Sequence, residues 1–444
     1  MSRPINFHVL AELTPDQRAA LLRRTEDDLS PYLERVDPII ARVKAEGDQA
    51  LAACARAFDN SPVEPHQIAA NEAEFAAAFQ ALDAEMLQVL EFAADNIRRF
   101  HEAQLPEPMW LKQMQPGVMA GDKLSPIDSV ACYVPRGKGA FPSVVLMTSI
   151  PAVVAGVPKP VIITPPGPDG GIDAATLVAA RLAGVERVYK CGGAQGVAAV
   201  AYGTETVPRC LKVVGPGSPW VVAAKQRLSH LIDPGIPAGP SESIVLADAS
   251  ADGRLCALDL LVEAEHGPDS SAYLVTDTRA VAEAALDAIP TFWAQMGAQR
   301  VDFSATVLGG PLGGIVLAES FDQAIDFVND YAPEHLQIQS AEPWRYVGAI
   351  RNAGEILLGA DTSFPLANYL LGPNAVLPTG GHARTRSALS VHDFMKRISI
   401  AYVTPDGYPR LAPATERYAQ YEGFDAHANA VSAIRTALTK DSEQ

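Results

Sequence analysis

Two carboxylate–histidine pairs are the residues best suited to chemistry in this sequence. In VEAEHGPDSS, residues 262–271, Glu263 and His266 lie three apart at the end of an apolar helix expected over residues 252–266. Residues at this spacing share a helix face, so the carboxylate and imidazole could chelate one divalent ion, while Glu265 points elsewhere. A histidine with solvated glutamates is also common at a helix C-terminus. This stretch alone leaves both interpretations open.

The second pair is Glu334 and His335, in YAPEHLQIQ. Pro333 is expected to end the preceding helix, which puts the pair at the entering end of a strand. Ligands of open α/β sheets usually bind outside the opposite, carboxyl ends of the strands, so the sheet alone predicts no site here. An acid beside a histidine could relay protons, and two solvated loop residues are an equal alternative.

Three weaker signals accompany these pairs. PAGPSES places Ser241 in a turn before a strand, where its hydroxyl could orient a substrate, although most turns of this composition are structural. The loops CGGAQG and VGPGSPW lie between strands and helices and could bind phosphate, but neither fits GxGxxG. Near the end of the chain, YEGFDAHANA holds Glu422 and His427 five residues apart, and such a histidine usually has no special role.

The composition favours small-molecule chemistry in a soluble protein. The chain has 444 residues, 48% of them hydrophobic and 20% charged, and contains no apolar run long enough to span a membrane. No secretory signal is apparent, so the cytoplasm is the simplest location. A net charge of −17 disfavours nucleic acid as a partner. Five cysteines without a CxxC pair argue against disulfides and thiolate metal sites, and are expected to be buried thiols.

The elements that must position the candidate residues alternate between strand and helix from about residue 129. Strands are expected at SVACYVP, PVIITPP, RVYKCGG, LKVVGPG, SIVLAD, SAYLVTD, GIVLAE, HLQIQ and GEILLG. Helices between them indicate βαβ units and parallel sheets. We expect a helical region over residues 1–125, α/β domains over 126–238 and 239–380, and a polar tail over 381–444 with a helix near 426–439.

Together these segments resemble one family. The blocks PRGKGAFPSVVLMTSIPAVVAGV, GGAQGVAAVAYGTETVP, PAGPSES, EAEHGPDS, APEHLQI, GPNAVLPTGGHARTRSALSVHDFMKR and EGFDAHANAV are similar, in order, to the signature blocks of histidinol dehydrogenase. The resemblance covers about residues 25–435. It implies NAD-dependent oxidation of L-histidinol to L-histidine through an aldehyde. It also implies an intertwined homodimer of two incomplete Rossmann-like domains with small end domains, and a zinc ion in each active site.

The resemblance also implies a role for each candidate residue. His335 would be the general base that takes the hydroxyl proton, and Glu334 would activate the water that attacks the aldehyde. Tyr133, Gln195 and Ser218 match positions that contact the cofactor. The metal positions are Glu263, His266, Asn368 and His427, the last donated by the partner subunit. The substrate would contact Ser241, Glu263, His266, His335, Asn368, Glu422 and His427.

Two departures from the family concern the zinc ligands. Glu263 stands where the family has glutamine, and Asn368 stands where it has aspartate. The two changes together keep one negative charge, and for a divalent ion the number of anionic ligands matters more than which residue supplies them. We therefore expect zinc to bind with its carboxylate on the helix. Asp361 could replace the lost carboxylate, although its position is not a ligand in the family.

Further departures concern the substrate and the cofactor. Ala375 replaces a histidine that contacts the substrate, and Gly217-Ser218 replaces a Gly-Asn pair of the cofactor loop. Losing hydrogen bonds to a substrate suggests changed specificity. Three hypotheses follow: a histidinol dehydrogenase with a rearranged zinc shell, a relative that oxidises another small polar alcohol, or a non-catalytic ligand-binding protein. The intact Glu334–His335 pair argues against the third.

Overall fold

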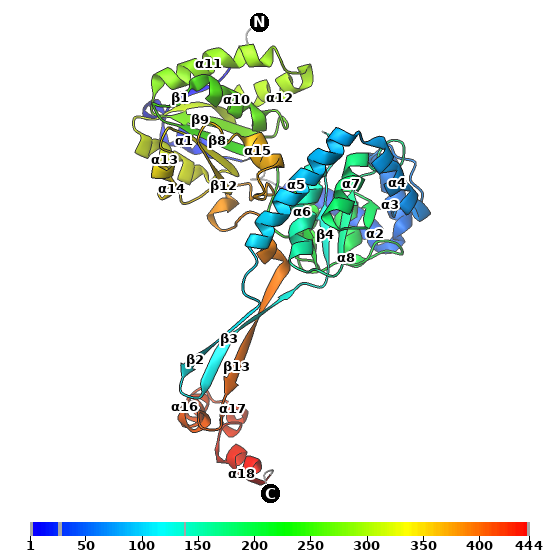
Figure 1. The fold of residues 1–444 in the computed structure, drawn as a ribbon, viewed down its shortest axis with the longest axis vertical. Coiled ribbons are helices and arrows are strands. Elements are labelled where there is room, and N and C mark those ends of the chain that lie inside the picture. Colours follow the sequence, from blue (N-terminus) through cyan, green and yellow to red (C-terminus); the bar gives the residue numbers. More distant parts are fainter. Residues whose placement is uncertain (1–2, 25–28, 137–138, 442–444) are drawn as a thin grey trace. The chain divides into compact units, whose positions relative to one another are not determined.

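The structure, a computed structural model, describes residues 3–24, 29–136 and 139–441. The chain forms two compact units (Figure 1). The first combines Met1–Leu105 with Ile127–Phe394 and contains two parallel sheets. The second combines Pro106–Pro126 with Met395–Gln444 and contains one antiparallel sheet.

The first parallel sheet has the strand order β6-β5-β4-β7. Its strands are β4 (Val130–Tyr133), β5 (Pro160–Thr164), β6 (Val188–Lys190) and β7 (Lys212–Val214). Its helices are α2 (Ser30–Glu46), α3 (Asp48–Phe58), α4 (Glu72–Ala81), α5 (Ala84–Ala103), α6 (Pro142–Val154), α7 (Ala174–Ala183), α8 (Gly193–Tyr202) and α9 (Pro219–Leu228). α6 and α7 pack together with α4 and α5, while α8 and α9 pack with α2. All of β4 is buried, as expected of a parallel strand covered by helices.

The second parallel sheet has the order β1-β10-β9-β8-β11-β12. Its strands are β1 (Phe7–Val9), β8 (Glu242–Ala247), β9 (Ser271–Thr276), β10 (Gly313–Leu317), β11 (His335–Gln339) and β12 (Glu355–Leu358). Its helices are α1 (Pro15–Leu21), α10 (Gly253–Ala264), α11 (Arg279–Trp293), α12 (Ala298–Leu308), α13 (Phe321–Tyr331), α14 (Trp344–Val347) and α15 (Phe364–Tyr369). One core lies between the sheet and α10–α12, and a second between the sheet and α13. The predicted fold class, α/β with parallel sheets, is confirmed.

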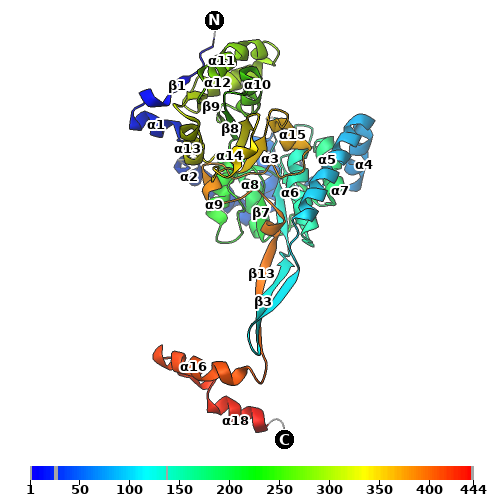
Figure 2. The same cartoon turned by 60° about the vertical axis from the view of Figure 1, so that its left-hand side comes forward.

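The N-terminal region departs from the prediction that residues 1–125 are helical. β1 pairs in parallel with β10, so the start of the chain is an edge strand of the second sheet (Figure 2). β2 (Met109–Gln115) and β3 (Val118–Pro126) form an antiparallel hairpin. The helical prediction is therefore wrong for these three segments. β1 has only three residues, too few to show a periodic pattern of apolar residues. Every residue of β2 is exposed, so its sequence shows no alternation between buried apolar and exposed polar residues.

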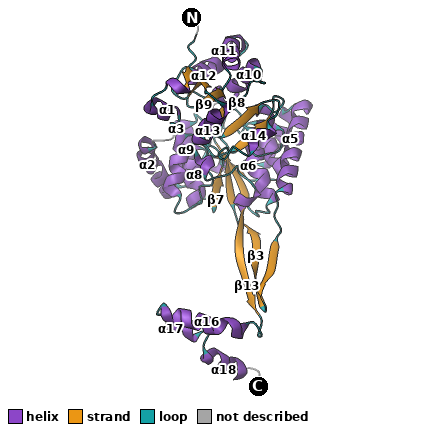
Figure 3. Ribbon diagram, turned by 90° about the vertical axis from the view of Figure 1, so that its left-hand side faces the viewer, coloured by secondary structure: helices purple, strands orange, loops and turns teal. Residues whose placement is uncertain are grey.

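The second unit is built on an antiparallel sheet in the order β13-β3-β2. β13 (Met395–Val403) pairs along its whole length with β3. The helices α16 (Tyr408–Tyr421), α17 (Asp425–Asn429) and α18 (Ala433–Asp441) follow β13 (Figure 3). The predicted helix near 426–439 is thus two helices, and the polar tail also contains a long strand. The predicted domain boundaries at residues 126, 239 and 381 remain predictions.

Two further expectations can be compared with the structure. All five cysteines are buried and none is in a disulfide, as expected of buried thiols. Over the described ranges, no helix combines the length and the apolarity needed to cross a bilayer.

Candidate active site

A pocket of about 310 Å³ in the first unit brings together residues from both parallel sheets. Ser218 and Arg136 line it from the segments that follow β7 and β4. Ser241 lines it from the segment before β8. The pocket is also lined by Glu263, His266, Glu334, His335, Asn368 and Ala375. Seven of the eleven predicted site residues therefore share one pocket.

Strand pairing explains why these segments meet. β4 and β7 are parallel neighbours, so the chain leaves both at the carboxyl edge of the first sheet. β8 and β11 are also parallel neighbours, with His335 beside Ser243, so Ser241 and Glu334 lie at the entering edge of the second sheet. The rule that ligands bind at carboxyl ends holds for the first sheet only. The second sheet contributes its opposite edge.

His335 is held between two glutamates. Its Nδ1 lies 2.5 Å from Oε1 of Glu355, and its Nε2 lies 3.8 Å from Oε1 of Glu334. Oε2 of Glu334 accepts a hydrogen bond of 2.9 Å from the backbone N–H of Glu242. Glu334 and His335 are only 7% and 4% exposed. The alternative that they are two solvated loop residues is therefore wrong.

The surroundings of this pair shift both pKa values. Burial raises the pKa of Glu334 well above its ordinary value. Burial alone would lower the pKa of His335, but Glu334, Glu263 and Glu355 raise it above its ordinary value, which makes the imidazole a stronger base. A buried group that can hold and release a proton beside a pocket is suited to general acid–base catalysis.

Glu263, His266 and Asn368 form a cluster in the same pocket. The Nδ2 of Asn368 donates a hydrogen bond of 3.0 Å to Oε1 of Glu263. The Nδ1 of His266 lies 3.1 Å from Oε2 of Glu263 and 3.0 Å from the carbonyl oxygen of Val262. Glu263 is 1% exposed, so the solvated-glutamate interpretation of this helix end is wrong for Glu263.

The donors in this cluster fit a divalent cation. Burial alone would raise the pKa of Glu263, but His266, His335 and hydrogen bonds bring it below its ordinary value, which keeps the carboxylate anionic. Among the residues that the structure describes, the buried Oδ1 of Asn368 has no hydrogen-bond partner. Because a carbonyl only accepts, the Val262 contact places the ring proton of His266 on Nδ1 and leaves Nε2 free to bind a cation.

Only two residues of this cluster, Glu263 and His266, belong to the residue types that most often bind metals. In the part of the chain that the structure describes, no group of three His, Cys, Asp or Glu residues is arranged to hold a metal. The third donor of the cluster is the amide oxygen of Asn368. Asp361, considered as a replacement carboxylate, is exposed and does not line the pocket.

The predicted cofactor residues lie at the carboxyl edge of the first sheet. Tyr133 is the last residue of β4, and its hydroxyl accepts a hydrogen bond of 3.2 Å from the backbone N–H of Gly193. Gln195 lies in the first turn of α8, with its side-chain oxygen against Gly193, where φ is +59°. Ser218 precedes α9 and lines the pocket. Tyr133 and Gln195 are buried and do not line it.

Comparison with known proteins identifies the family. The family model for histidinol dehydrogenase matches residues 22–435. The chain is 58% identical to a "histidinol dehydrogenase homolog" of Colwellia psychrerythraea over the whole of both chains. It is 48% identical to a histidinol dehydrogenase of Synechocystis, over 95% of this chain and 97% of the relative. The chain belongs to the histidinol dehydrogenase family. Membership of this family supports the prediction that the protein is an oxidoreductase that acts on a small molecule.

A solved histidinol dehydrogenase has the same fold. The crystal structure of the enzyme from Elizabethkingia anophelis matches with a TM-score of 0.92 and 31% identity. The match covers 99% of this chain and 100% of that chain. The resemblance inferred from the sequence blocks is therefore confirmed.

Two of the predicted site residues, Glu422 and His427, lie outside the first unit. Glu422 directly follows α16, and His427 lies in α17. Both residues are exposed in the single chain. Their expected contacts with substrate and metal remain predictions.

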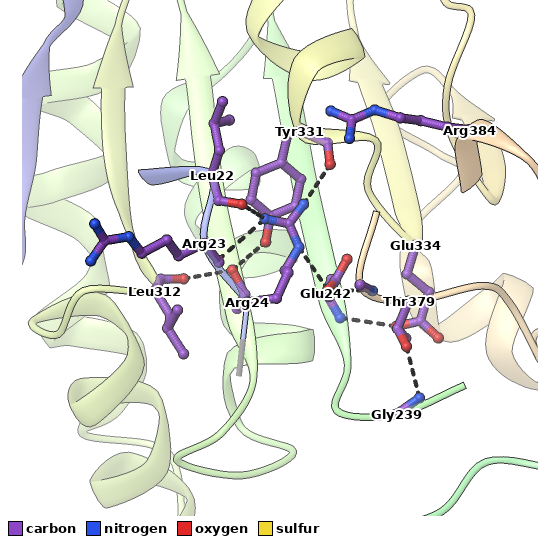
Figure 4. Close-up of polar contacts among 12 residues, drawn as sticks. Leu22, Arg23, Arg24, Gly239, Glu242, Leu312, Tyr331, Glu334, Thr379 and Arg384 are labelled. Atoms are coloured by element: carbon purple, nitrogen blue, oxygen red, sulfur yellow. Dashed lines mark hydrogen bonds and ion pairs between the residues drawn. The ribbon is translucent and has the colours of Figure 1, made fainter. Parts of the chain in front are cut away.

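Three residues that support the Glu334–His335 pair were not predicted from the sequence. Glu355 contacts His335, and Glu242 contacts Glu334. Arg24 forms a 2.8 Å ion pair with Glu242, and its guanidinium lies 3.3 Å from the centroid of the Tyr331 ring (Figure 4). A charged residue at the start of an apolar strand, as in both ESIVLA and GEILLG, was the available signal for the two glutamates.

Proposed function

We propose that this protein is an NAD-dependent, zinc-requiring dehydrogenase that oxidises a small polar alcohol to an acid through an aldehyde. The observation that carries the proposal is the buried Glu334–His335 pair, which lies in one pocket with Glu263, His266 and Asn368. The Glu334–His335 pair transfers protons, and the neighbouring donor atoms bind a cation. A binding protein has no need of either feature, which argues against the non-catalytic alternative.

Each residue of the pair has a separate task in this proposal. Nε2 of His335 takes the proton of the substrate hydroxyl, and NAD, when bound, would supply the hydride acceptor. Glu334 then removes a proton from the water that attacks the aldehyde. Its raised pKa helps it to accept that proton. Ser241, at the entering edge of the second sheet, hydrogen-bonds the substrate, and Tyr133, Gln195 and Ser218 are proposed to contact the cofactor.

Zinc would be held by Glu263, His266 and Asn368, with His427 of a second subunit as the further ligand. Bound zinc would polarise the substrate oxygen as a Lewis acid. Support comes from the anionic state of Glu263 and from the buried, unpartnered Oδ1 of Asn368. Glu263 and Asn368 together supply the single negative charge that glutamine and aspartate supply in the family pattern.

The homodimer expected from the family is supported by the surface of the second unit. Large apolar side chains of this unit are exposed on its strands and helices: Met109, Trp110, Leu111, Met114, Ile398, Tyr402, Tyr418, Tyr421, Phe424, Ile434 and Leu438. Exposed apolar surface of this extent is typical of a protein interface. We propose that a second copy of the chain covers it.

The substrate is either L-histidinol or another small polar alcohol. One observation favours the second candidate. Ala375 lines the pocket where the family pattern has a substrate-contacting histidine, and its methyl group can neither donate nor accept a hydrogen bond. A site that loses such a contact binds the original substrate less selectively.

The test is NADH formation by the purified protein with saturating zinc and NAD. L-Histidinol and a panel of other small polar alcohols serve as substrates, and His335→Gln serves as the inactive control. Turnover of L-histidinol at roughly 1–10³ per second would identify a histidinol dehydrogenase. Turnover of another alcohol with none of L-histidinol would support the second candidate. Failure to bind NAD would support the non-catalytic alternative instead.

A further inference from the structure

We infer that Glu355 is a positioning residue for His335, fixing the direction of the imidazole and the nitrogen that faces the substrate. The inference rests on the proposed function, because it assigns a supporting group to the proposed base. Its observation is the contact between the Glu355 carboxylate and Nδ1 of His335 on neighbouring strands.

Strand register brings the two side chains together. β11 and β12 are parallel, and His335 pairs with Glu355. Paired residues of neighbouring strands project to the same face of a sheet, so the first residue of β12 lies beside the first residue of β11. The backbone N–H of Glu355 donates a hydrogen bond of 3.1 Å to the carbonyl of Glu334. The backbone of Glu355 is thus tied to the residue directly before His335.

The close approach of the two strands depends on a glycine. The N–H of Gly354 donates a hydrogen bond of 2.9 Å to the carbonyl of Pro333. A Cβ at position 354 would lie 2.5 Å from the carbonyl oxygen of Glu334, closer than Cβ atoms approach other atoms. Glycine therefore permits the strand start that carries Glu355 to lie against the Glu334–His335 segment.

The hydrogen bond assigns the two ring nitrogens. An ionised carboxylate only accepts hydrogen bonds, so the 2.5 Å contact places a proton on Nδ1 of His335. Nε2 is then the nitrogen that can take a proton, and it is the one on the side of Glu334, at 3.8 Å. Phe364 packs edge-on against the imidazole, with ring centroids 5.9 Å apart. The carboxylate and this ring together hold the imidazole in one orientation.

Packing alone does not explain a glutamate at this position. The other residues of β12 are Ile356, Leu357 and Leu358, and the side chain of Glu355 is only 9% exposed. A buried carboxylate is costly unless it is paired, and glutamate is disfavoured in strands. Glu355 has the imidazole as its partner, and a negative charge next to Nδ1 would stabilise the imidazolium that forms when Nε2 accepts a proton.

The first test compares the kinetics of Glu355→Gln with those of the wild type. The amide keeps the size of the side chain, but can present either an oxygen or an NH₂ group to Nδ1. It therefore no longer enforces one tautomer and provides no charge. We expect kcat to fall about 10²-fold or more, as for general-base catalysis, while KM changes less than about threefold. Glu342→Gln, a matched change of an exposed glutamate, should leave both unchanged.

The second test does not depend on turnover. With ring-¹⁵N histidine, the wild-type protein should show an Nδ1 proton of His335 at unusually low field, because the short hydrogen bond deshields it. The signal should disappear in His335→Gln, which assigns it, and move upfield in Glu355→Gln. An unprotonated Nδ1 in the wild type, or an unchanged kcat in Glu355→Gln, would overturn the inference. If the signal is present but no alcohol is oxidised, the proposed function has failed while the positioning contact remains.

Discussion

Replacing Arg24 with methionine should strongly destabilise the second α/β domain. The Nε of Arg24 lies 2.8 Å from Oε1 of Glu242, and both side chains are 5% exposed. The guanidinium also donates hydrogen bonds to the carbonyls of Leu22 and Tyr331. Methionine keeps much of the apolar stem, but leaves the Glu242 carboxylate buried without its arginine.

The size of this effect follows from the burial of the pair. Two unit charges 2.8 Å apart attract by roughly 6 kcal/mol at an effective dielectric constant of about 20. Part of that attraction offsets the loss of hydration. Removal of one partner from a buried pair generally costs about 3–5 kcal/mol, and we expect Arg24→Met to fall in this range. Combining it with Glu242→Gln removes both charges, so the double variant should lose less than about 2 kcal/mol.

Urea unfolding at a fixed protein concentration would measure these differences. Trp293 reports on the domain concerned, because this last residue of α11 is buried in the core. Arg23→Met is the matched control: the side chain of Arg23 is exposed, and its loss should cost no more than about 0.5 kcal/mol. A loss below about 1 kcal/mol for Arg24→Met would refute the reasoning. So would a double variant as unstable as the sum of the two single variants.

Three further predictions concern other parts of the molecule. Burial raises the pKa of Asp59 from 3.8 to about 6, so the native state binds this proton more tightly than the unfolded chain. The resulting stability is complete below about pH 4 and is lost as the pH rises through about 6. Asp59→Asn should flatten this dependence in urea titrations, and an unchanged pH profile would count against it. Glu263→Ala should lower the zinc content of protein expressed with ample metal, whereas Glu265→Ala should not; a wild type without zinc by elemental analysis would contradict the proposed ligands. Trp110→Glu places a charge on the exposed face of β2 and should shift the protein from dimer to monomer in analytical ultracentrifugation, while a monomeric wild type would exclude the proposed homodimer.

The α/β core could be predicted from local sequence patterns. β8 is SIVLA after its first glutamate, and α10 follows a turn at Asp252, which caps the helix through the N–H of Arg254. Short apolar strands, helices and turn residues in alternation are sufficient to predict parallel sheets. The antiparallel sheet of the second unit could not be predicted in this way. β3 pairs with β13 more than 260 residues later in the chain, and most of β13 is exposed, so β13 has no buried face that would give a local apolar signal.

The candidate site was predictable only where its geometry is local. Glu263 and His266 are only three residues apart, and their side chains meet at the end of α10, although the helix ends at Ala264, before His266. Their position in one pocket with Glu334 and His335 depends on the order of β8 and β11 in the sheet, which no local pattern specifies. The same is true of Glu355, whose contact with His335 follows from strand register. The family resemblance, and not the spacing of the residues in the sequence, predicted that these residues form one site.

The separate roles proposed for His335 and Glu334 can be tested most directly by product analysis. With zinc, NAD and an alcohol that the wild type oxidises, wild-type protein should form the acid and two NADH per alcohol. Glu334→Gln should release aldehyde with one NADH per alcohol, and His335→Gln should form almost no NADH. Unimpaired NADH formation by His335→Gln, or normal acid formation by Glu334→Gln, would contradict the assignment of these two residues as base and water-activating group.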